Sequence, residues 1–416
     1  MNMIRPLDEA DFDAFLTIFA NAYPGLPLAS EEARQRLRQR LARWHTDTDT
    51  ELYGLFREGR LLGGVRFVDF TMNLLSVKAL AGGLALVAVD LPHKKEKVAR
   101  DMVLEFLRHY RERGACLTLL YPFRLDFYKK MGFGYGAPMR QYRVRPDALP
   151  KGPSKARVRF LSKGDAPALV ACYNRHAART HGMLEKTQSE AACVFDRPEV
   201  QFVGVADGNA IQGYLAFAFE RAHERNFICN DLHIREFIYE DREALSELLT
   251  FLHSQADQVN RIIINTQDEF FHHLLADARD GTGNLIPHAA HQICAAGLGI
   301  MYRVTDVRRL FQVLESRDFG GQTCTLKLTV TDSFLPENDG SVLVRFVNGR
   351  AQIVESGRPD AEVRLDIAEF SSLIMGVVPF RALHHYGLAD ISDPAWADAV
   401  ERIFAVETKP VCTTVF

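Results

Sequence analysis

The sequence lacks several features that assign a chain quickly to a class. Its seven Cys residues are scattered without a Cys-x-x-Cys pair, so neither a disulfide framework nor a zinc site of that kind is indicated. No apolar run is long enough to span a bilayer. The first six residues do not have the charged-then-apolar layout of a signal peptide. We therefore expect a cytoplasmic protein.

Charge of one sign is not in excess either. The formal net charge is -3 over 416 residues, which gives no electrostatic reason to expect binding to nucleic acid or to a membrane. A hydrophobic share of 47% and a charged share of 25% are those of an ordinary globular protein. The length exceeds what one core usually supports, so two or three domains are expected.

The most informative part of the sequence is a strand–loop–helix–strand pattern that ends in FYKKMGFGYG. Its parts are an apolar run, a Lys-rich loop, a helix with apolar residues at helical spacing, a second apolar run and the Gly-rich ending: residues 84–89, 92–97, 98–113, 116–121 and 127–136. A loop that opens a helix points several backbone N–H groups at one spot, and the helix dipole adds positive potential there. The pattern therefore predicts a site for a pyrophosphate.

This pattern resembles the acyl-CoA core of a GNAT N-acetyltransferase. In that family the loop usually reads Arg/Gln-x-x-Gly-x-Gly/Ala, whereas here Lys94 holds the first position, Lys97 the central Gly position and Ala99 the last. The resemblance implies that the strand and the loop hold acetyl-CoA through Val87, Ala88, Val89, His93, Lys94, Lys95, Lys97, Val98 and Ala99. Lys97 is a departure that either crowds the phosphate or contacts it. A solvated basic turn before an ordinary amphipathic helix is the alternative interpretation.

We expect three segments along the chain. Residues 1–150 contain this core, and a linker rich in Gly, Pro and Ser follows at 151–155. Residues 151–303 repeat the order of elements, but acidic residues replace the lysines at 239–243, where they would repel a pyrophosphate. In residues 304–416 strands are followed by LDIAEFSSLIMGVVPFRALHHYG, which is similar to a sterol carrier protein. The expected fold class is α+β: tandem GNAT folds, the second degenerate, followed by a sterol carrier protein-like α/β domain.

Together the three segments resemble the Eis (enhanced intracellular survival) family over the whole chain. The most specific local matches are LYPFRLDFYKKMGFGYG at 120–136 and the ending PVCTTVF at 410–416. The resemblance implies an acyltransferase that uses acetyl-CoA to acetylate amines of aminoglycosides or polyamine-like compounds, in a homohexamer. The transfer of an acetyl group from a thioester to an amine needs no metal. It also implies a Tyr general acid, here Tyr128, and a general base supplied by the chain's terminal carboxylate, here that of Phe416.

Both catalytic candidates have an ordinary alternative interpretation. Without the family pattern, Tyr128 is a core aromatic beside Phe127, and Phe416 is a frayed chain end. The ending from 411 to 416 is unusually apolar for a frayed tail, which favours one that is folded in. A terminal carboxylate has an ordinary pKa of about 3.5. Burial would have to raise that pKa, or a water would have to relay the proton, for the carboxylate to act on an ammonium near neutral pH.

Other polar clusters are weaker candidates. His288, His291 and Cys294 are evenly spaced, but no fourth ligand is evident, so we predict no metal site. Asp47, Asp49 and Glu51 either line an acidic entrance for a cationic substrate or form a solvated loop.

A function of another class is also open at this point. A binding or regulatory protein could keep the GNAT shell with little turnover and use its C-terminal domain for an apolar ligand. Lys97 in place of Gly favours that alternative, whereas Tyr128 and the apolar C-terminus favour the enzyme. The sequence therefore predicts a GNAT-type N-acetyltransferase.

Overall fold

The computed structural model describes residues 2–26 and 30–416, and the chain divides into two compact units. Unit 1 consists of Met1–Gly136, Ile300–Thr408 and Val415–Phe416, and unit 2 consists of Ala137–Gly299 and Lys409–Thr414. Both units are therefore assembled from segments that are distant in the sequence.

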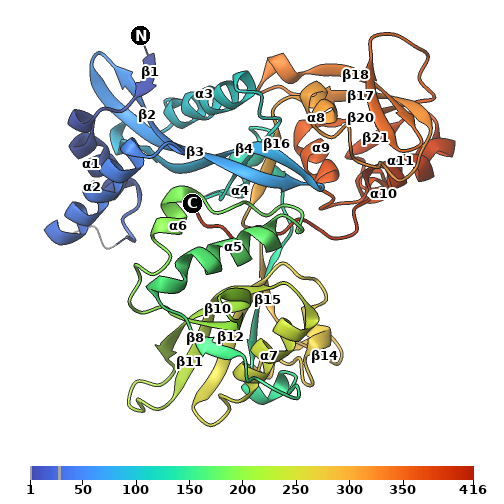
Figure 1. Ribbon diagram of the computed structural model, residues 1–416. Coiled ribbons are helices and arrows are strands. Elements are labelled where there is room, and N and C mark those ends of the chain that lie inside the picture. Colours follow the sequence, from blue (N-terminus) through green and yellow to red (C-terminus); the bar gives the residue numbers. More distant parts are fainter. Residues whose placement is uncertain (1, 27–29) are drawn as a thin grey trace. The chain divides into compact units, whose positions relative to one another are not determined.

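The N-terminal part of unit 1 is built on a seven-stranded sheet with the strand order β1-β2-β3-β4-β5-β16-β6 (Figure 1). The strands are β1 (Asn2–Pro6), β2 (Thr50–Arg57), β3 (Arg60–Leu74), β4 (Val77–Val89), β5 (Leu117–Leu120), β6 (Gly134–Tyr135) and β16 (Met301–Val304). The first four strands are antiparallel neighbours. Strands β4 and β5 run parallel, and α3 (Val98–Glu112) connects them, so the expected strand–loop–helix–strand unit is present.

Helices cover both faces of this sheet. Gly63 and Gly64 are consecutive in β3 and therefore face opposite sides. A Cβ on Gly63 would contact α3 at Val98, and a Cβ on Gly64 would contact Phe15 of α1. The helices of this part are α1 (Phe12–Ala22), α2 (Glu31–Thr46), α3 and α4 (Leu125–Lys129). All the apolar residues of the α3 stripe are buried, as their helical spacing predicts: Val98, Met102, Val103, Phe106, Leu107 and Tyr110.

The C-terminal part of unit 1 contains a five-stranded sheet with the order β19-β18-β17-β20-β21. Its strands are β17 (Cys324–Thr331), β18 (Gly340–Val347), β19 (Arg350–Val354), β20 (Ala361–Asp366) and β21 (Ala389–Ile391). Its helices are α8 (Val307–Val313), α9 (Ile367–Ile374), α10 (Phe380–His385) and α11 (Ala397–Phe404). Strands followed by helices are the pattern expected of the sterol carrier-like segment.

The two sheets of unit 1 are joined through α9. The Ser372 hydroxyl donates to the carbonyl of Tyr135, and the N–H of Val304 donates to the Ser371 hydroxyl. A Cβ at Gly134 would stand 2.2 Å from the carbonyl oxygen of Ala368, so only glycine lets β6 approach α9 this closely. The Gly-aromatic-Gly stretch of the sequence motif therefore also provides the contact surface for the C-terminal part.

A buried ion pair lies beside this junction. Arg303 of β16 donates two parallel hydrogen bonds to the Asp332 carboxylate, with Nη1–Oδ2 and Nη2–Oδ1 distances of 3.0 and 2.8 Å. Both side chains are fully buried. The Asn338 amide and the N–H of Leu335 also donate to Asp332, so the carboxylate is surrounded by donors. Strand β16 is thereby fixed to the loop that follows β17.

Unit 2 contains a second seven-stranded sheet, with the order β15-β7-β12-β11-β10-β9-β8, and a two-stranded hairpin. The sheet strands are β7 (Met139–Val144), β8 (Val158–Phe160), β9 (Gln201–Asp207), β10 (Ala210–Arg221), β11 (Asn230–Tyr239), β12 (Val259–Thr266) and β15 (Ala295–Gly297). The hairpin is β13 (Leu285–Ile286) with β14 (Ala290–His291), and the helices are α5 (Ala166–Ala177), α6 (Gln188–Ala192) and α7 (Arg242–His253). Parallel β11 and β12 are connected by α7, which repeats the β4–α3–β5 arrangement.

The units differ from the segments 1–150, 151–303 and 304–416 that the sequence suggests. Strand β7, which lies within the first expected segment, pairs with β12 of unit 2. Strand β16, expected to end the second segment, lies between β5 and β6 in unit 1. The changes of unit therefore fall at 136/137, 299/300, 408/409 and 414/415 rather than at the linker. The composition of a linker can be recognised in the sequence. The sheet that a short strand joins depends on contacts with residues far away in the sequence, which composition does not reveal.

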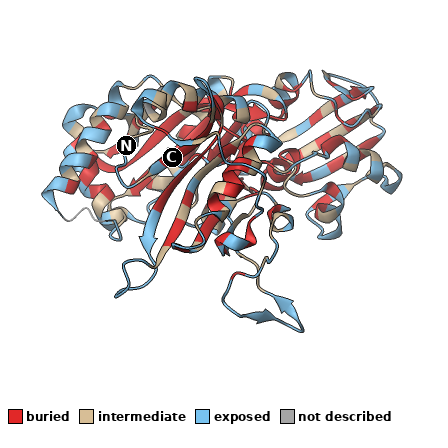
Figure 2. Cartoon of the chain, turned by 60° about the horizontal axis from the view of Figure 1, so that its bottom comes forward, coloured by how far each residue is buried: buried red, intermediate tan, exposed pale blue. Residues whose placement is uncertain are grey.

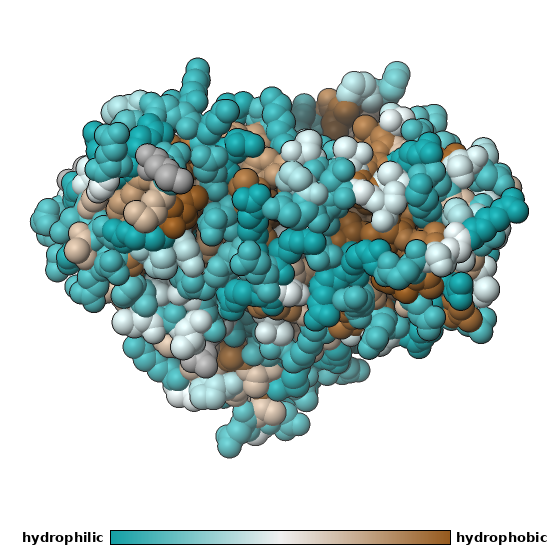
Figure 3. Space-filling view, turned by 90° about the horizontal axis from the view of Figure 1, so that it is seen from above, coloured by the Kyte–Doolittle hydropathy of each residue, from teal (hydrophilic) through white to brown (hydrophobic). Residues whose placement is uncertain are grey.

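Buried residues concentrate on the strands of the sheets, and exposed residues on the outward sides of the helices (Figure 2). The face seen in Figure 3 is largely hydrophilic, with smaller apolar areas between the polar side chains. Among the helices of the described residues, none has the length and apolar character needed to cross a membrane.

Candidate active site

Strand β4 has an open edge where the sequence predicts the acyl-CoA site. Its pairing with β5 ends at Leu84 opposite Leu120, whereas β4 itself continues to Val89. Leu86 has a φ of +53°, and the register with β3 shifts at this point, which marks a β-bulge. The two parallel strands therefore separate beyond Leu84.

The backbone groups on this open edge follow from strand alternation. The N–H of Asp90 donates to the carbonyl of Leu62, so Asp90 faces β3. Alternation then turns the polar groups of Val87 and Val89 away from β3, and those of Ala88 toward it. Of the three strand residues predicted to hold acetyl-CoA, Val87 and Val89 are placed to offer backbone hydrogen bonds.

The start of α3 is open to an anion. Its N-cap residue is Lys97, in the left-handed conformation with a φ of +67°. A Lys side chain has no acceptor, so it cannot cap the N–H groups of the first turn. The corresponding helix α7 is different, because the Asp241 carboxylate accepts from the N–H of Ala244 and occupies that position. This contrast agrees with an anion site in the first copy and a degenerate second copy.

The charged side chains of the loop before α3 differ in their exposure to solvent. Lys94, Lys95 and Lys97 are exposed. His93 is half-buried, and its Nδ1 lies 3.3 Å from the Glu96 carboxylate. Hydrogen bonds from Arg57, and then from His93, hold the pKa of the Glu96 carboxyl below its ordinary value. His93 is therefore partnered by Glu96, whereas the lysines remain at the surface beside the start of α3.

Lys97 stands where the GNAT pattern usually has Gly. The backbone at this position is left-handed, a conformation that costs an L-residue about 1–2 kcal/mol and that glycine adopts freely. Lys97→Gly is therefore expected to raise the free energy of unfolding by about 1 kcal/mol. Denaturant unfolding of wild type, Lys97→Gly and Lys97→Ala measures the change. The Ala variant removes the same charge but keeps a Cβ, so a Gly variant no more stable than the Ala variant would contradict this explanation.

Tyr128 lies on α4 and is only 2% exposed. Its ring makes edge contacts with Phe123 and Phe133, at centroid distances of 5.5 and 5.9 Å. Burial raises the pKa of the Tyr128 hydroxyl well above its ordinary value, and interaction with Tyr23 raises it further. The hydroxyl therefore keeps its proton at neutral pH, which a general acid must do. Its burial is also what a core aromatic would show, so burial alone does not assign a role.

The end of the chain is packed inside unit 1. The ring of Phe416 lies 5.0 Å from that of Phe70 on β3 and 5.5 Å from that of Tyr121, which follows β5. A Cβ on Gly83 would lie 3.1 Å from the same ring. Because Gly83 precedes the last paired residue of β4, Phe416 sits where β4 and β5 begin to separate.

The residues just before this end belong to unit 2, where four interactions hold them. These are Lys409 with Glu269, Val411 N–H to the carbonyl of His181, Cys412 N–H to Gln267 Oε1, and Thr414 with the hydroxyl of Tyr173. The sequence gives no local signal for any of these partners. It indicates only that the tail is apolar enough to be folded in.

Sequence reasoning also missed Tyr23, which it placed only on the apolar face of the first helix. The Tyr23 hydroxyl donates to the carbonyl of Val87 at 2.7 Å, on the open edge of β4.

One residue of the predicted acidic cluster, Glu51, has charged partners within the chain. Glu51 lies in β2, 3.3 Å from His109 and 3.5 Å from Arg113. The hydrogen bond with His109, before other causes, lowers the pKa of Glu51, so its charge is already matched within the chain.

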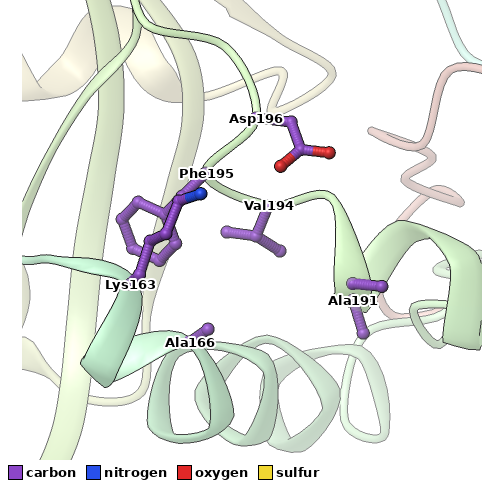
Figure 4. A pocket seen from close by; sticks show the side chains of 7 residues that line it. Lys163, Ala166, Ala191, Val194, Phe195 and Asp196 are labelled. Carbon is purple, nitrogen blue, oxygen red and sulfur yellow. The ribbon is translucent and has the colours of Figure 1, made fainter.

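The remaining candidates are a metal site and a pocket away from the open edge of β4. Among the residues that the structure describes, no three His, Cys, Asp or Glu side chains converge as a metal site requires, and this includes His288, His291 and Cys294. A pocket in unit 2 is lined by small and apolar side chains between Lys163 and Asp196: Ala166, Ala191, Ala192, Val194 and Phe195 (Figure 4). It is distinct from the open edge of β4.

The chain matches three family models. Models described as "Acetyltransferase (GNAT) domain" match residues 3–136 and residues 174–304. A model described as "Sterol carrier protein domain" matches residues 310–413. The chain is a GNAT-type N-acetyltransferase. Its two GNAT domains and C-terminal sterol carrier protein domain confirm the order expected from the sequence, and the non-catalytic alternative is not retained.

Several solved structures share the fold of this GNAT protein over the whole chain. GCN5-related N-acetyltransferases from Anabaena variabilis and Kribbella flavida have TM-scores of 0.81 and 0.80, each with 18% identity, covering 100% of this chain and 100% and 98% of theirs. Eis1 from Mycobacterium abscessus has a TM-score of 0.78 and 19% identity, covering 100% of both chains. The resemblance to the Eis architecture is thus confirmed for the fold. No curated protein matches the chain.

Proposed function

We propose that unit 1 transfers the acetyl group of acetyl-CoA to amine groups of a polyamine-like or aminoglycoside acceptor. The observation that carries the proposal is the open edge of β4, which leads into the uncapped start of α3. Val89 fits an amide group of a pantetheine arm, and the N–H of Val87 fits the thioester carbonyl oxygen. The first turn of α3, with Lys94, Lys95 and Lys97, fits a pyrophosphate. The GNAT family uses acetyl-CoA, and these residues suit it.

The protein has four tasks in this reaction. It binds the thioester, takes a proton from the ammonium, stabilises negative charge on the carbonyl oxygen and protonates the leaving sulfur. Acetyl-CoA supplies an activated acetyl group. We assign removal of the first ammonium proton to the terminal carboxylate of Phe416. The N–H of Val87 would stabilise the negative charge on the carbonyl oxygen, and the hydroxyl of Tyr128 would protonate the leaving sulfur. The second proton of the ammonium leaves through solvent and replaces the one that Tyr128 gives up.

The proposal has three further parts. A homohexameric assembly rests on the Eis resemblance, a cytoplasmic location rests on the N-terminal sequence and the hydropathy pattern, and a reaction without a metal ion rests on the four tasks above. Light scattering on the purified chain measures the assembly. Activity after dialysis against a chelator measures the metal requirement, and we expect it to be unchanged.

The test of the function is thiol release from acetyl-CoA with a panel of aminoglycosides and simple polyamines. Deleting Phe416 moves the terminal carboxylate by one residue and is expected to lower turnover about 100-fold, the lower range for a general base. Phe416→Leu is the matched control, because it keeps an apolar side chain and a carboxylate at the same position, and it should retain most of the activity.

Three outcomes separate the parts of this proposal. Calorimetric binding of acetyl-CoA without turnover on any amine of the panel would show that the acceptor class is wrong. A deletion variant as active as wild type would remove the role of Phe416. Wild type that does not bind acetyl-CoA would contradict the proposal as a whole.

A further inference from the structure

We propose that Tyr23 is a positioning residue for this reaction: it holds the Val87 carbonyl, and with it the extended conformation of Val87, so that the Val87 N–H is presented to the thioester oxygen. The inference rests on the proposed function and adds a residue to it. It starts from the hydrogen bond between the Tyr23 hydroxyl and the Val87 carbonyl, with an O–O distance of 2.7 Å.

The position of Tyr23 is fixed by the helix that it ends. Tyr23 is the C-cap of α1, and its N–H donates to the carbonyl of Phe19. Its ring also lies against that of Phe19, with a centroid distance of 4.8 Å. Because α1 packs on β3 through Phe15, the phenol is anchored to the sheet on which its hydroxyl acts. The hydroxyl is therefore held by a rigid element rather than by a loop.

The Val87 carbonyl needs such a partner because of the bulge before it. Leu86 is left-handed, and the β4–β5 ladder has already ended at Leu84. The carbonyl and the N–H of one strand residue point to the same edge. Once Tyr23 binds the carbonyl, the N–H is the group that Val87 offers to a ligand. Preorganised backbone N–H groups of this kind are worth most when their orientation is fixed in advance.

The packing around Val87 supports the same role. Tyr23, Leu86 and Ala88 belong to one hydrophobic cluster, so the residues on both sides of Val87 are packed together with the phenol. In addition to burial, interaction with Tyr23 raises the pKa of the Tyr128 hydroxyl, which agrees with this placement.

The experiment compares wild type, Tyr23→Phe and Tyr53→Phe. Tyr53 is the matched control because its hydroxyl also makes a hydrogen bond within unit 1, to Glu51 at 3.1 Å, but away from the open edge. The thioester carbonyl stretch of bound acetyl-CoA, labelled with 13C at that carbon, is measured by isotope-edited infrared spectroscopy. Turnover is measured in parallel.

In Tyr23→Phe we expect the stretch to move to higher frequency, because the hydrogen bond to the oxygen weakens. We expect kcat to fall about 10-fold, less than the ~10²–10³ for removing an oxyanion donor outright, with KM for acetyl-CoA within about 2-fold. Tyr53→Phe should match wild type in both. An unchanged stretch in Tyr23→Phe, even with a lower melting temperature, would reduce Tyr23 to a structural anchor and overturn the inference. Failure of wild type to bind acetyl-CoA would instead overturn the proposed function, and the inference with it.

Discussion

Tyr128→Phe is expected to lower kcat at least 100-fold while leaving KM for acetyl-CoA nearly unchanged, since general acids contribute about 10²–10⁴. The change removes only the hydroxyl. The ring keeps its contacts with Phe123, Phe127 and Phe133, so packing around α4 is preserved. Because burial raises the pKa of Tyr128, the hydroxyl is protonated at neutral pH and ready to donate. Its loss acts on the step in which the sulfur leaves, not on binding.

Steady-state kinetics on an amine accepted by wild type measures this effect. Tyr135→Phe is the control, because Tyr135 is a nearby tyrosine whose ring faces the Lys129 ammonium, and Phe keeps that face. The control should retain wild-type turnover. A Tyr128→Phe variant with more than a tenth of the wild-type kcat would contradict the acid role and leave Tyr128 as a core aromatic.

Arg303→Met is expected to lower the free energy of unfolding of unit 1 by about 3–5 kcal/mol, the usual loss when one partner of a buried ion pair is removed. Asp332 would then be a buried carboxylate without its cation. Total stabilities are about 5–15 kcal/mol, so the loss is a large share. Arg303 also lies against Gly132, so the change acts beside the Gly-aromatic-Gly stretch.

Denaturant unfolding followed by tryptophan fluorescence measures this loss in the right place. The chain has two Trp residues, Trp44 and Trp396, and both lie in unit 1. Arg303→Met combined with Asp332→Asn removes both charges and keeps a hydrogen-bonding side chain at 332. The double variant should recover part of the loss. Equal stability of wild type and Arg303→Met would show that the ion pair does not stabilise unit 1.

Local patterns in the sequence carry much of this architecture. The apolar stripe of α3, its Lys-rich start and the Gly-rich ending are continuous in the chain, so their spacing is enough to predict the strand–loop–helix–strand unit. The acidic start of α7 likewise predicts that the second copy differs from the first. In each case, neighbours in sequence are neighbours in space.

What the sequence could not predict depends on pairing between distant residues. The four residues of β16, MYRV, are apolar enough to suit a strand in either sheet. Only their pairing with β5 and β6 places them in the sheet of unit 1. The bond from Tyr23 to Val87 spans 64 positions. Gly134 looks like part of a local motif, yet a Cβ at this position would collide with the carbonyl oxygen of Ala368. No window of the sequence contains both partners of these contacts.

The position of β16 has a consequence for how the protein is made. Strand β6 joins the first sheet through β16, so that sheet is incomplete on the ribosome until residue 304 has been synthesised. A nascent chain that has not yet reached β16 therefore lacks the complete sheet that carries the open edge of β4.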